Sequence, residues 1–217
     1  MVERYEKRSK GIVIIDETLN AVTHGLGVGF AIWGFLLLLA KSNTTLERVA
    51  VSIYSATLIL LFLISCLRHA LFFTPASKTF QVLDHASIFL LIAGTYTPYC
   101  LLPLAGWVGT TILIIVWICA IVGLVVTSVF LPRWKRVPKL ATALYVVMGW
   151  IILIAMWPLW ESMPHTSFWL LIIGGVVYSL GAAIYHYKFP FAHLVWHVFV
   201  LAAAFLMWLS IYGILGH

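Results

Sequence analysis

Long apolar stretches, rather than alternating apolar and polar residues, dominate this sequence. Stretches without Asp, Glu, Lys or Arg cover residues 18–40, 49–67, 85–132, 140–160, 162–187 and 189–217. A membrane-spanning helix needs about 20 apolar residues, so the 48 residues of 85–132 suit two helices and each other stretch suits one. Pro98, Pro103 and Gly106 interrupt the longest stretch near its middle. The pattern predicts seven transmembrane helices, with approximate limits 19–40, 47–70, 81–102, 107–131, 140–158, 168–187 and 191–214.

The composition agrees with this interpretation. Of the 217 residues, 63% are hydrophobic and 9% are charged, whereas a soluble domain has about 25% charged residues. These numbers exclude a soluble globular protein and a nucleic-acid-binding chain. Backbone groups in lipid must be hydrogen-bonded internally, so we expect an all-α, multi-pass protein of the cell membrane. Residues 1–18 are predicted to be a cytoplasmic segment, and residues 19–217 a single transmembrane domain.

The basic residues predict the orientation. Eleven of the 13 Lys and Arg residues fall in the N-terminal segment and in the connections between helices 2 and 3, 4 and 5, and 6 and 7. Lys41 and Arg48 fall on the other side. Because cytoplasmic segments carry the excess of Lys and Arg, the N-terminus is expected in the cytoplasm and the C-terminus outside. The net charge of +6 then indicates an anionic membrane surface rather than a nucleic acid as the partner.

Polar residues gather at the cytoplasmic ends of the predicted helices. Six of the eight histidines lie there, namely His24, His69, His85, His186, His193 and His197. Asp84 lies at the same level, and ionisable residues inside a membrane mark functional sites. Since His193 and His197 are four residues apart, both rings lie on one helix face and could hold a metal ion, although such a pair is more often structural. Ser65 lies one turn before His69 and could bind a ligand or its own helix.

A further polar stripe opens the first predicted helix. Glu17, Asn20 and His24 follow an i, i+3, i+7 spacing, which places them along one face. Acidic and amide side chains commonly cap the start of a helix, and this explains Glu17 better than His24. Alternatively, the three residues orient a metal ligand through hydrogen bonds.

Three patterns occur in a fixed order along the chain: Glu17-x-x-Asn20-x-x-x-His24, then Ser65-x-x-x-His69 followed by Asp84, then His193-x-x-x-His197. With these patterns on seven helices, the sequence resembles the hemolysin III branch of the progestin and adipoQ receptor family, which includes the adiponectin receptors. The resemblance implies one Zn²⁺ per chain on the cytoplasmic side, with His69, His193 and His197 as ligands. It also implies that Asp84 contacts the zinc-bound water and that Ser65 is a neighbouring polar group.

Three protein ligands and a water are typical of a catalytic zinc site. Zinc makes hydroxide available at neutral pH, and Asp84 is a candidate to orient the water and accept its proton. The leading hypothesis is therefore a zinc-dependent hydrolase that acts on an amide or ester of a membrane lipid, with a ceramide-like substrate favoured by the resemblance. The alternative is a non-enzymatic, zinc-stabilised regulator or sensor of membrane state, and a pore or transporter is less favoured. The sequence does not indicate an oligomeric state.

Overall fold

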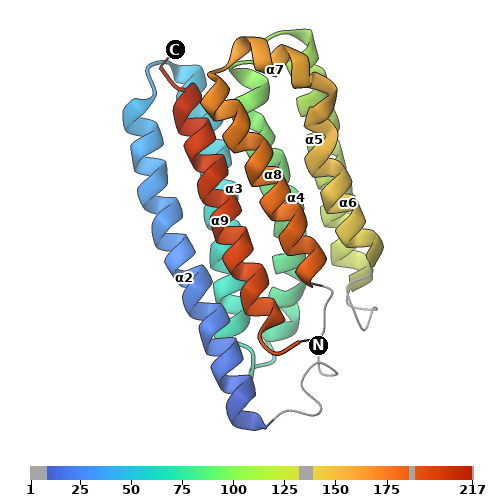
Figure 1. Cartoon of the computed structure of the whole chain (residues 1–217). Helices are drawn as coiled ribbons and strands as arrows, with labels where there is room; N and C mark the ends of the chain where they lie inside the picture. Colours follow the sequence, from blue (N-terminus) through green and yellow to red (C-terminus); the bar gives the residue numbers. More distant parts are fainter. Residues whose placement is uncertain (1–8, 132–138, 186–188, 217) are drawn as a thin grey trace.

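The chain runs up and down between the two ends of a helical bundle (Figure 1). A computed structural model describes residues 9–131, 139–185 and 189–216, and all regular secondary structure in these ranges is helical. The helices are α2 (Lys10–Lys41), α3 (Thr45–Ala70), α4 (Ser77–Leu101), α5 (Trp107–Phe130), α6 (Lys139–Trp150), the 3₁₀ helix η2 (Ile151–Ala155), α7 (Met156–Ser162), α8 (His165–Tyr185) and α9 (Ala192–Ile214). We call the end where α2 begins and α3 ends the histidine end, for reasons given below.

Six helical segments in the described ranges are long and apolar enough to cross a membrane: α2, α3, α5, the run Ala141–Ser162, α8 and α9. α4 has a comparable length of 25 residues but is not among the six. It lies inside the bundle and buries polar side chains, including His85, Ser87 and Thr97. The multi-pass membrane character is thus confirmed, whereas the seven-span count and the cytoplasmic placement of the N-terminus stay predictions. Many of the basic residues behind that placement, at 1–8, 132–138 and 186–188, lie outside the described residues.

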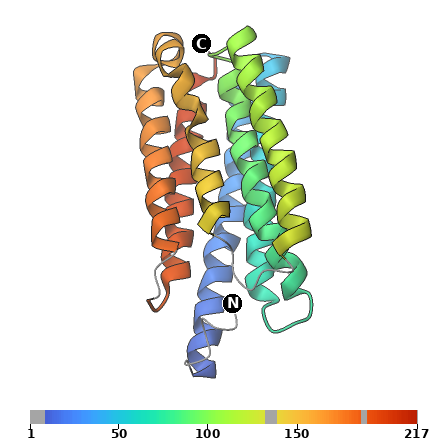
Figure 2. The ribbon, with the colours of Figure 1, turned by 90° about the vertical axis from the view of Figure 1, so that its right-hand side faces the viewer.

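Most of the long helices pack against their neighbours in the chain, and α2 also packs against α9. α2 packs against α3 and α9, α3 packs against α4, α4 packs against α5, and α8 packs against α9. α6 lies beside α4 and α8 (Figure 2). Large apolar side chains on the outer faces, such as Leu26, Trp107, Ile154 and Trp157, are exposed and suit contact with lipid. Within the described residues, most buried polar side chains lie on α2, α3, α4 and α9.

The first helix begins earlier than the apolar pattern indicates. α2 begins at Lys10 rather than near residue 19, with Ser9 as its N-cap residue. Asp16, Glu17 and Asn20 lie inside the helix and are buried. Acidic residues interrupt the apolar pattern here, although they face the interior of the bundle and do not end the helix. The uncharged stretches therefore do not predict this part of α2.

The fifth predicted helix is not continuous. α6 ends at Trp150 and gives way to η2 before α7 continues to Ser162. Pro158 lacks the N–H that would bond to the carbonyl of Ile154, so regular α-helix is disfavoured here. The Tyr96 hydroxyl from α4 stabilises the junction, since it accepts a hydrogen bond from the Ile152 N–H at 2.8 Å, and its single proton is shared between the carbonyls of Met148 and Gly149.

Small residues let the central helices approach closely. A Cβ atom at Gly94 of α4 would lie 2.0 Å from Oγ1 of Thr57 in α3. A Cβ atom at Gly27 of α2 would lie 2.7 Å from the Phe62 ring in α3. Both positions therefore need glycine, which is common where membrane helices pack tightly. This close packing fixes α2, α3 and α4 around the site described next.

Candidate metal centre

Three buried histidines meet at the histidine end of the bundle. His69 lies in the last turn of α3, whereas His193 and His197 occupy the first two turns of α9. Phe191, with a φ of 60°, turns the chain sharply into α9 just before His193. One ring nitrogen of each histidine lies within 4.8 Å of the others, and Nε2 of His69 lies 3.1 Å from Nε2 of His193. In the described part of the chain, this group of His, Cys, Asp or Glu residues could hold a metal ion.

The donor set fits a tetrahedral metal site. Zn–N bonds of about 2.0–2.1 Å place two ligand nitrogens about 3.4 Å apart in a tetrahedron. The 3.1 Å between Nε2 of His69 and Nε2 of His193 is close to that value. The ligand nitrogens of all three histidines lie within 4.8 Å of one another, so small side-chain movements would bring them to the distances of a tetrahedral site. Imidazole ligands suit zinc, copper, iron and nickel, so the geometry alone does not select the metal.

Glu17 orients one of the three rings. Its Oε2 atom lies 2.6 Å from Nδ1 of His69, and both side chains are buried. This contact engages Nδ1 and leaves Nε2, the nitrogen that faces His193, available for a metal. A carboxylate in this position fixes the orientation of a ligating histidine. The interpretation of Glu17 as a cap at the start of the helix is wrong, because α2 begins at Lys10.

The other polar residues of α2 have different contacts. The side-chain amide of Asn20 donates to Oδ1 of Asp16, one turn earlier in the same helix, at 3.3 Å. Thr23, which the sequence analysis did not single out, places Oγ1 3.4 Å from Nδ1 of His197. Thr23 follows Asp16 by seven residues and Asn20 by three, so the helical spacing that revealed Glu17 and His24 could also have revealed Thr23.

His24 is close to the three histidines without belonging to the group. Its ring stacks on that of His197, with centroids 3.6 Å apart and an interplanar angle of 10°. The edge of its ring also meets Phe62. Within the part of the chain that the structure describes, neither ring nitrogen of His24 has a hydrogen-bond partner.

Asp84 of α4 forms an ion pair with a residue of the neighbouring helix α3. Its carboxylate binds the guanidinium of Arg68, which is 1% exposed, while the Asp84 side chain is 13% exposed. Asp84 is also within electrostatic range of His24 and His69. Arg68 is one of the eleven basic residues that were predicted to lie in the N-terminal segment and the connections, but it is a buried residue of α3. The sequence itself indicates that Asp84 has such a partner, because an acidic residue inside a membrane needs one.

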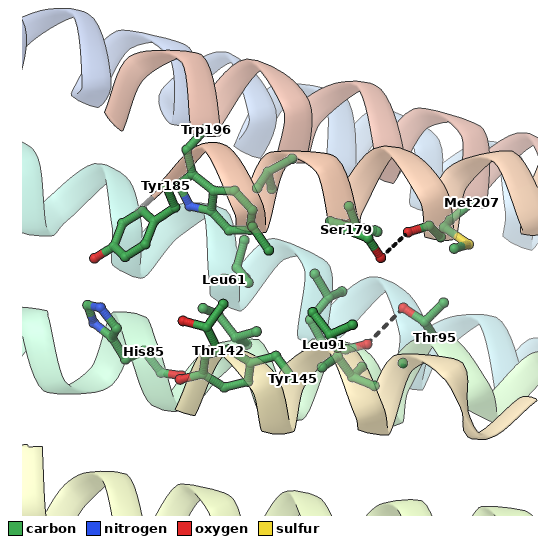
Figure 3. A pocket seen from close by; sticks show the side chains of 18 of the residues that line it. Leu61, His85, Leu91, Thr95, Thr142, Tyr145, Ser179, Tyr185, Trp196 and Met207 are labelled. Atoms are coloured by element: carbon green, nitrogen blue, oxygen red, sulfur yellow. Dashed lines mark hydrogen bonds between the residues drawn. The ribbon is translucent and has the colours of Figure 1, made fainter. Parts of the chain in front are cut away.

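A narrow cavity begins at this site. At the histidine end it is lined by Ser65, Arg68, Asp84, His85, His193 and His197, together with His24. Its walls follow α4 as far as Tyr99, which at 1.5 Å per residue is about 22 Å from Asp84. Figure 3 shows the polar end with His85 and Tyr185, and the far end with Thr95 and Met207. The cavity holds about 160 Å³ and is mainly apolar.

Two side chains from neighbouring helices close one wall of this cavity. Trp150 of α6 donates its ring N–H to the hydroxyl of Ser179 in α8 at 2.9 Å. Both residues line the cavity, as do Gly149 and Gly175. The hydrogen bond joins two helices that make few other contacts, and it lies beside the part of the cavity that leads away from the histidines.

Fold and site together define a multi-pass α-helical membrane protein with a buried three-histidine cluster at one end of the bundle. The model of the haemolysin-III related family matches residues 12–208, and the chain belongs to that family, the hemolysin III branch of the progestin and adipoQ receptor family. It is 39% identical over 200 residues to Hemolysin-3 of Bacillus cereus, with 90% of each chain covered. It is 39% identical over 202 residues to the Hemolysin-3 homolog of Bacillus subtilis (strain 168), covering 91% of this chain and 93% of the relative. It is 27% identical over 197 residues to the Monocyte to macrophage differentiation factor of Homo sapiens, covering 87% and 80%.

Proposed function

We propose that this protein is a zinc-dependent hydrolase that cleaves the amide or ester bond of a ceramide-like membrane lipid. The observation that carries the proposal is the mainly apolar cavity that starts at His193 and His197 and follows α4 into the bundle. A lipid chain in this cavity would place its polar linkage among the histidines. Membrane lipids are therefore the proposed partners, and the histidine end is proposed to face the cytoplasm.

Zinc is the proposed metal because of the ligand set. Three imidazole ligands with one position left for water are typical of catalytic zinc sites. When bound in such a site, zinc supplies a hydroxide nucleophile near neutral pH and polarises a carbonyl.

Three residues of the chain are proposed to assist metal binding, proton transfer and substrate binding. Glu17 holds the His69 ring in place through Nδ1. Asp84 lines the cavity at its histidine end, where a carboxylate could accept the proton of the attacking water. Ser65 is buried one turn deeper than His69 on α3 and lines the same cavity, where its hydroxyl could bond to the lipid linkage.

One observation favours a second candidate function. Asp84 is engaged by Arg68 in an ion pair that joins α3 and α4. If this pair is permanent, the carboxylate is not available as a base, and the metal would join α3 to α9 in a zinc-stabilised regulator or sensor of membrane state. The two candidates differ in what Asp84 does.

An assay with purified, zinc-loaded protein separates the two candidates. Release of fatty acid from a ceramide and from a diacylglycerol should be detectable with the native chain and should fall at least about 100-fold in Asp84→Asn, the usual scale for a general base. Zinc content should change little, because the three histidines remain. His165→Ala, on the exposed surface near Trp160, is the control and should keep full activity. Absence of lipid hydrolysis by the native protein, or full hydrolysis by Asp84→Asn, would contradict the proposal.

A further inference from the structure

His24 has an arrangement that the proposed metal centre does not explain. Its side chain is buried, with 3% of the residue exposed, and its ring lies flat against His197 at 3.6 Å. Stacking on His197 and the edge contact with Phe62 hold the ring plane in one orientation. His24 is not one of the three histidines that could bind a metal together.

The polar atoms of this ring are the unusual feature. Both nitrogens are buried, and neither has a hydrogen-bond partner among the described residues. A neutral imidazole carries one N–H donor and one acceptor. Unpaired polar groups inside a membrane cost free energy, and a phenylalanine would stack equally well without that cost. Stacking alone therefore does not explain why the position is a histidine.

The position of His24 indicates what its nitrogens meet. His24 lines the histidine end of the cavity from α2, while His193 and His197 line it from α9 and Asp84 from α4. A ligand group that reaches this end is surrounded by these helices. Of the groups in a lipid amide or ester, the carbonyl oxygen is an acceptor that matches an imidazole N–H.

We propose that His24 is a substrate-binding residue whose ring N–H donates a hydrogen bond to the carbonyl oxygen of the lipid in the cavity. The inference rests on the proposed function for the class of ligand, an acyl lipid, but not for the turnover of that ligand. Such a donor fixes the carbonyl beside His197, and the bond strengthens as negative charge develops on the oxygen.

A ligand that cannot be hydrolysed tests this proposal separately from catalysis. The probes are a long-chain methyl ketone, with an isotope-labelled carbonyl, and the alkane of the same length. Binding to the zinc-loaded protein in detergent is measured by native mass spectrometry, and the carbonyl stretching frequency by infrared spectroscopy. In the native protein we expect a lower stretching frequency than in detergent alone, as hydrogen bonding to the carbonyl requires.

The variants provide the decisive comparison. In His24→Phe, which keeps the stacked ring, the ketone should bind about tenfold more weakly, the scale of one hydrogen bond. Alkane binding and zinc content should be unchanged, and the stretching frequency should return to its value in detergent. His24→Gln keeps an N–H donor and should recover part of the binding. His165→Phe is the matched control, because His165 also stacks flat on an aromatic ring, Trp160 at 3.9 Å, but is exposed.

Several outcomes would overturn the proposal. Ketone binding and stretching frequency that are the same in His24→Phe and the native protein would make His24 a packing residue. Loss of zinc in His24→Phe would make it part of the metal centre. If His24→Phe does not fold, an unshifted carbonyl in the native protein still contradicts the hydrogen bond. A His24-dependent shift without lipid hydrolysis would refute the proposed hydrolase and leave this inference standing.

Discussion

At the scale of single residues, the informative side chains are those that a membrane protein keeps despite their cost. Glu17, Arg68 and the three clustered histidines are all buried, and each contacts another member of this set or Asp84. Charged and polar groups in such surroundings are retained where partners satisfy them. The contacts divide these residues into the metal ligands, the carboxylate that orients one ligand, and an ion pair beside them.

The first prediction concerns Glu17. Glu17→Gln keeps the size of the side chain but removes the charge that faces Nδ1 of His69. Loss of such an orienting carboxylate lowers metal affinity about 10–100-fold. Competition with a chelator should show this loss while the helical circular dichroism spectrum is unchanged. Glu161→Gln should bind zinc like the native chain, because Glu161 is exposed on α7, which lies at the opposite end of the bundle (Figure 1).

The second prediction concerns the ion pair of Arg68 and Asp84. Arg68→Met leaves a carboxylate without its cation in a largely buried place, so the free energy of unfolding should fall by about 3–5 kcal/mol. The double variant Arg68→Met/Asp84→Asn removes both charges and should lose less than the sum of the single variants, by at least about 1 kcal/mol. Unfolding in a denaturing detergent measures all three. Strict additivity would show that the two side chains do not interact.

At the scale of helices, the apolar stretches predict most of the bundle well, because a membrane imposes length and apolarity on each span. The limits expected for residues 47–70, 107–131 and 191–214 lie within two residues of α3, α5 and α9. Both departures involve the packing of the helices against one another. Acidic residues of α2 face inward, so they interrupt the apolar pattern without ending the helix. The break at η2 follows from Pro158 and is stabilised by Tyr96 of α4.

The candidate site, too, could be predicted only in part from the spacing of residues along each helix. The spacing of His193 and His197 follows from the helix repeat, and the resemblance joined His69 to them. The ion pair of Arg68 with Asp84 and the stacking of His24 depend on how helices α3, α4, α2 and α9 pack. The spacing of residues along one helix does not predict which residues of another helix it contacts. The ion pair and the stacked rings could therefore be identified only from the structure.

The third prediction tests the junction between α6 and η2. Tyr96→Phe removes the hydroxyl that accepts the Ile152 N–H and leaves that donor unpaired inside the bundle. The cost should be about 1–3 kcal/mol of unfolding free energy. Hydrogen exchange should rise at residues 148–152 and stay constant in α9. Tyr212→Phe, which lies on the exposed surface of α9, serves as the control.

At the scale of the whole molecule, the histidine end and the end where α9 stops lie at opposite ends of the bundle (Figure 1). The metal site, the ion pair and the polar end of the cavity all lie at the histidine end. The distribution of Lys and Arg predicts that this end faces the cytoplasm. The polar linkage of a lipid bound in the cavity would then lie at the cytoplasmic side.

The fourth prediction tests this orientation. Reporter fusions after residue 136 and at residue 217 should report opposite sides of the membrane, with residue 136 in the cytoplasm. The reason is the excess of basic residues in the segments assigned to that side. If both fusions report the cytoplasm, the number of spans between residues 136 and 217 is even rather than three, and the seven-span count is wrong.

The most direct test of the account is the metal content of purified protein. Elemental analysis should find about one zinc per native chain, and the double variant His193→Ala/His197→Ala should retain almost none, because a single remaining imidazole holds zinc weakly. His69→Ala should lower occupancy and thermal stability, since a bound metal stabilises the folded state. His165→Ala should change neither quantity. Undiminished zinc in the double variant would place the metal elsewhere and contradict the three-histidine centre on which the proposed function depends.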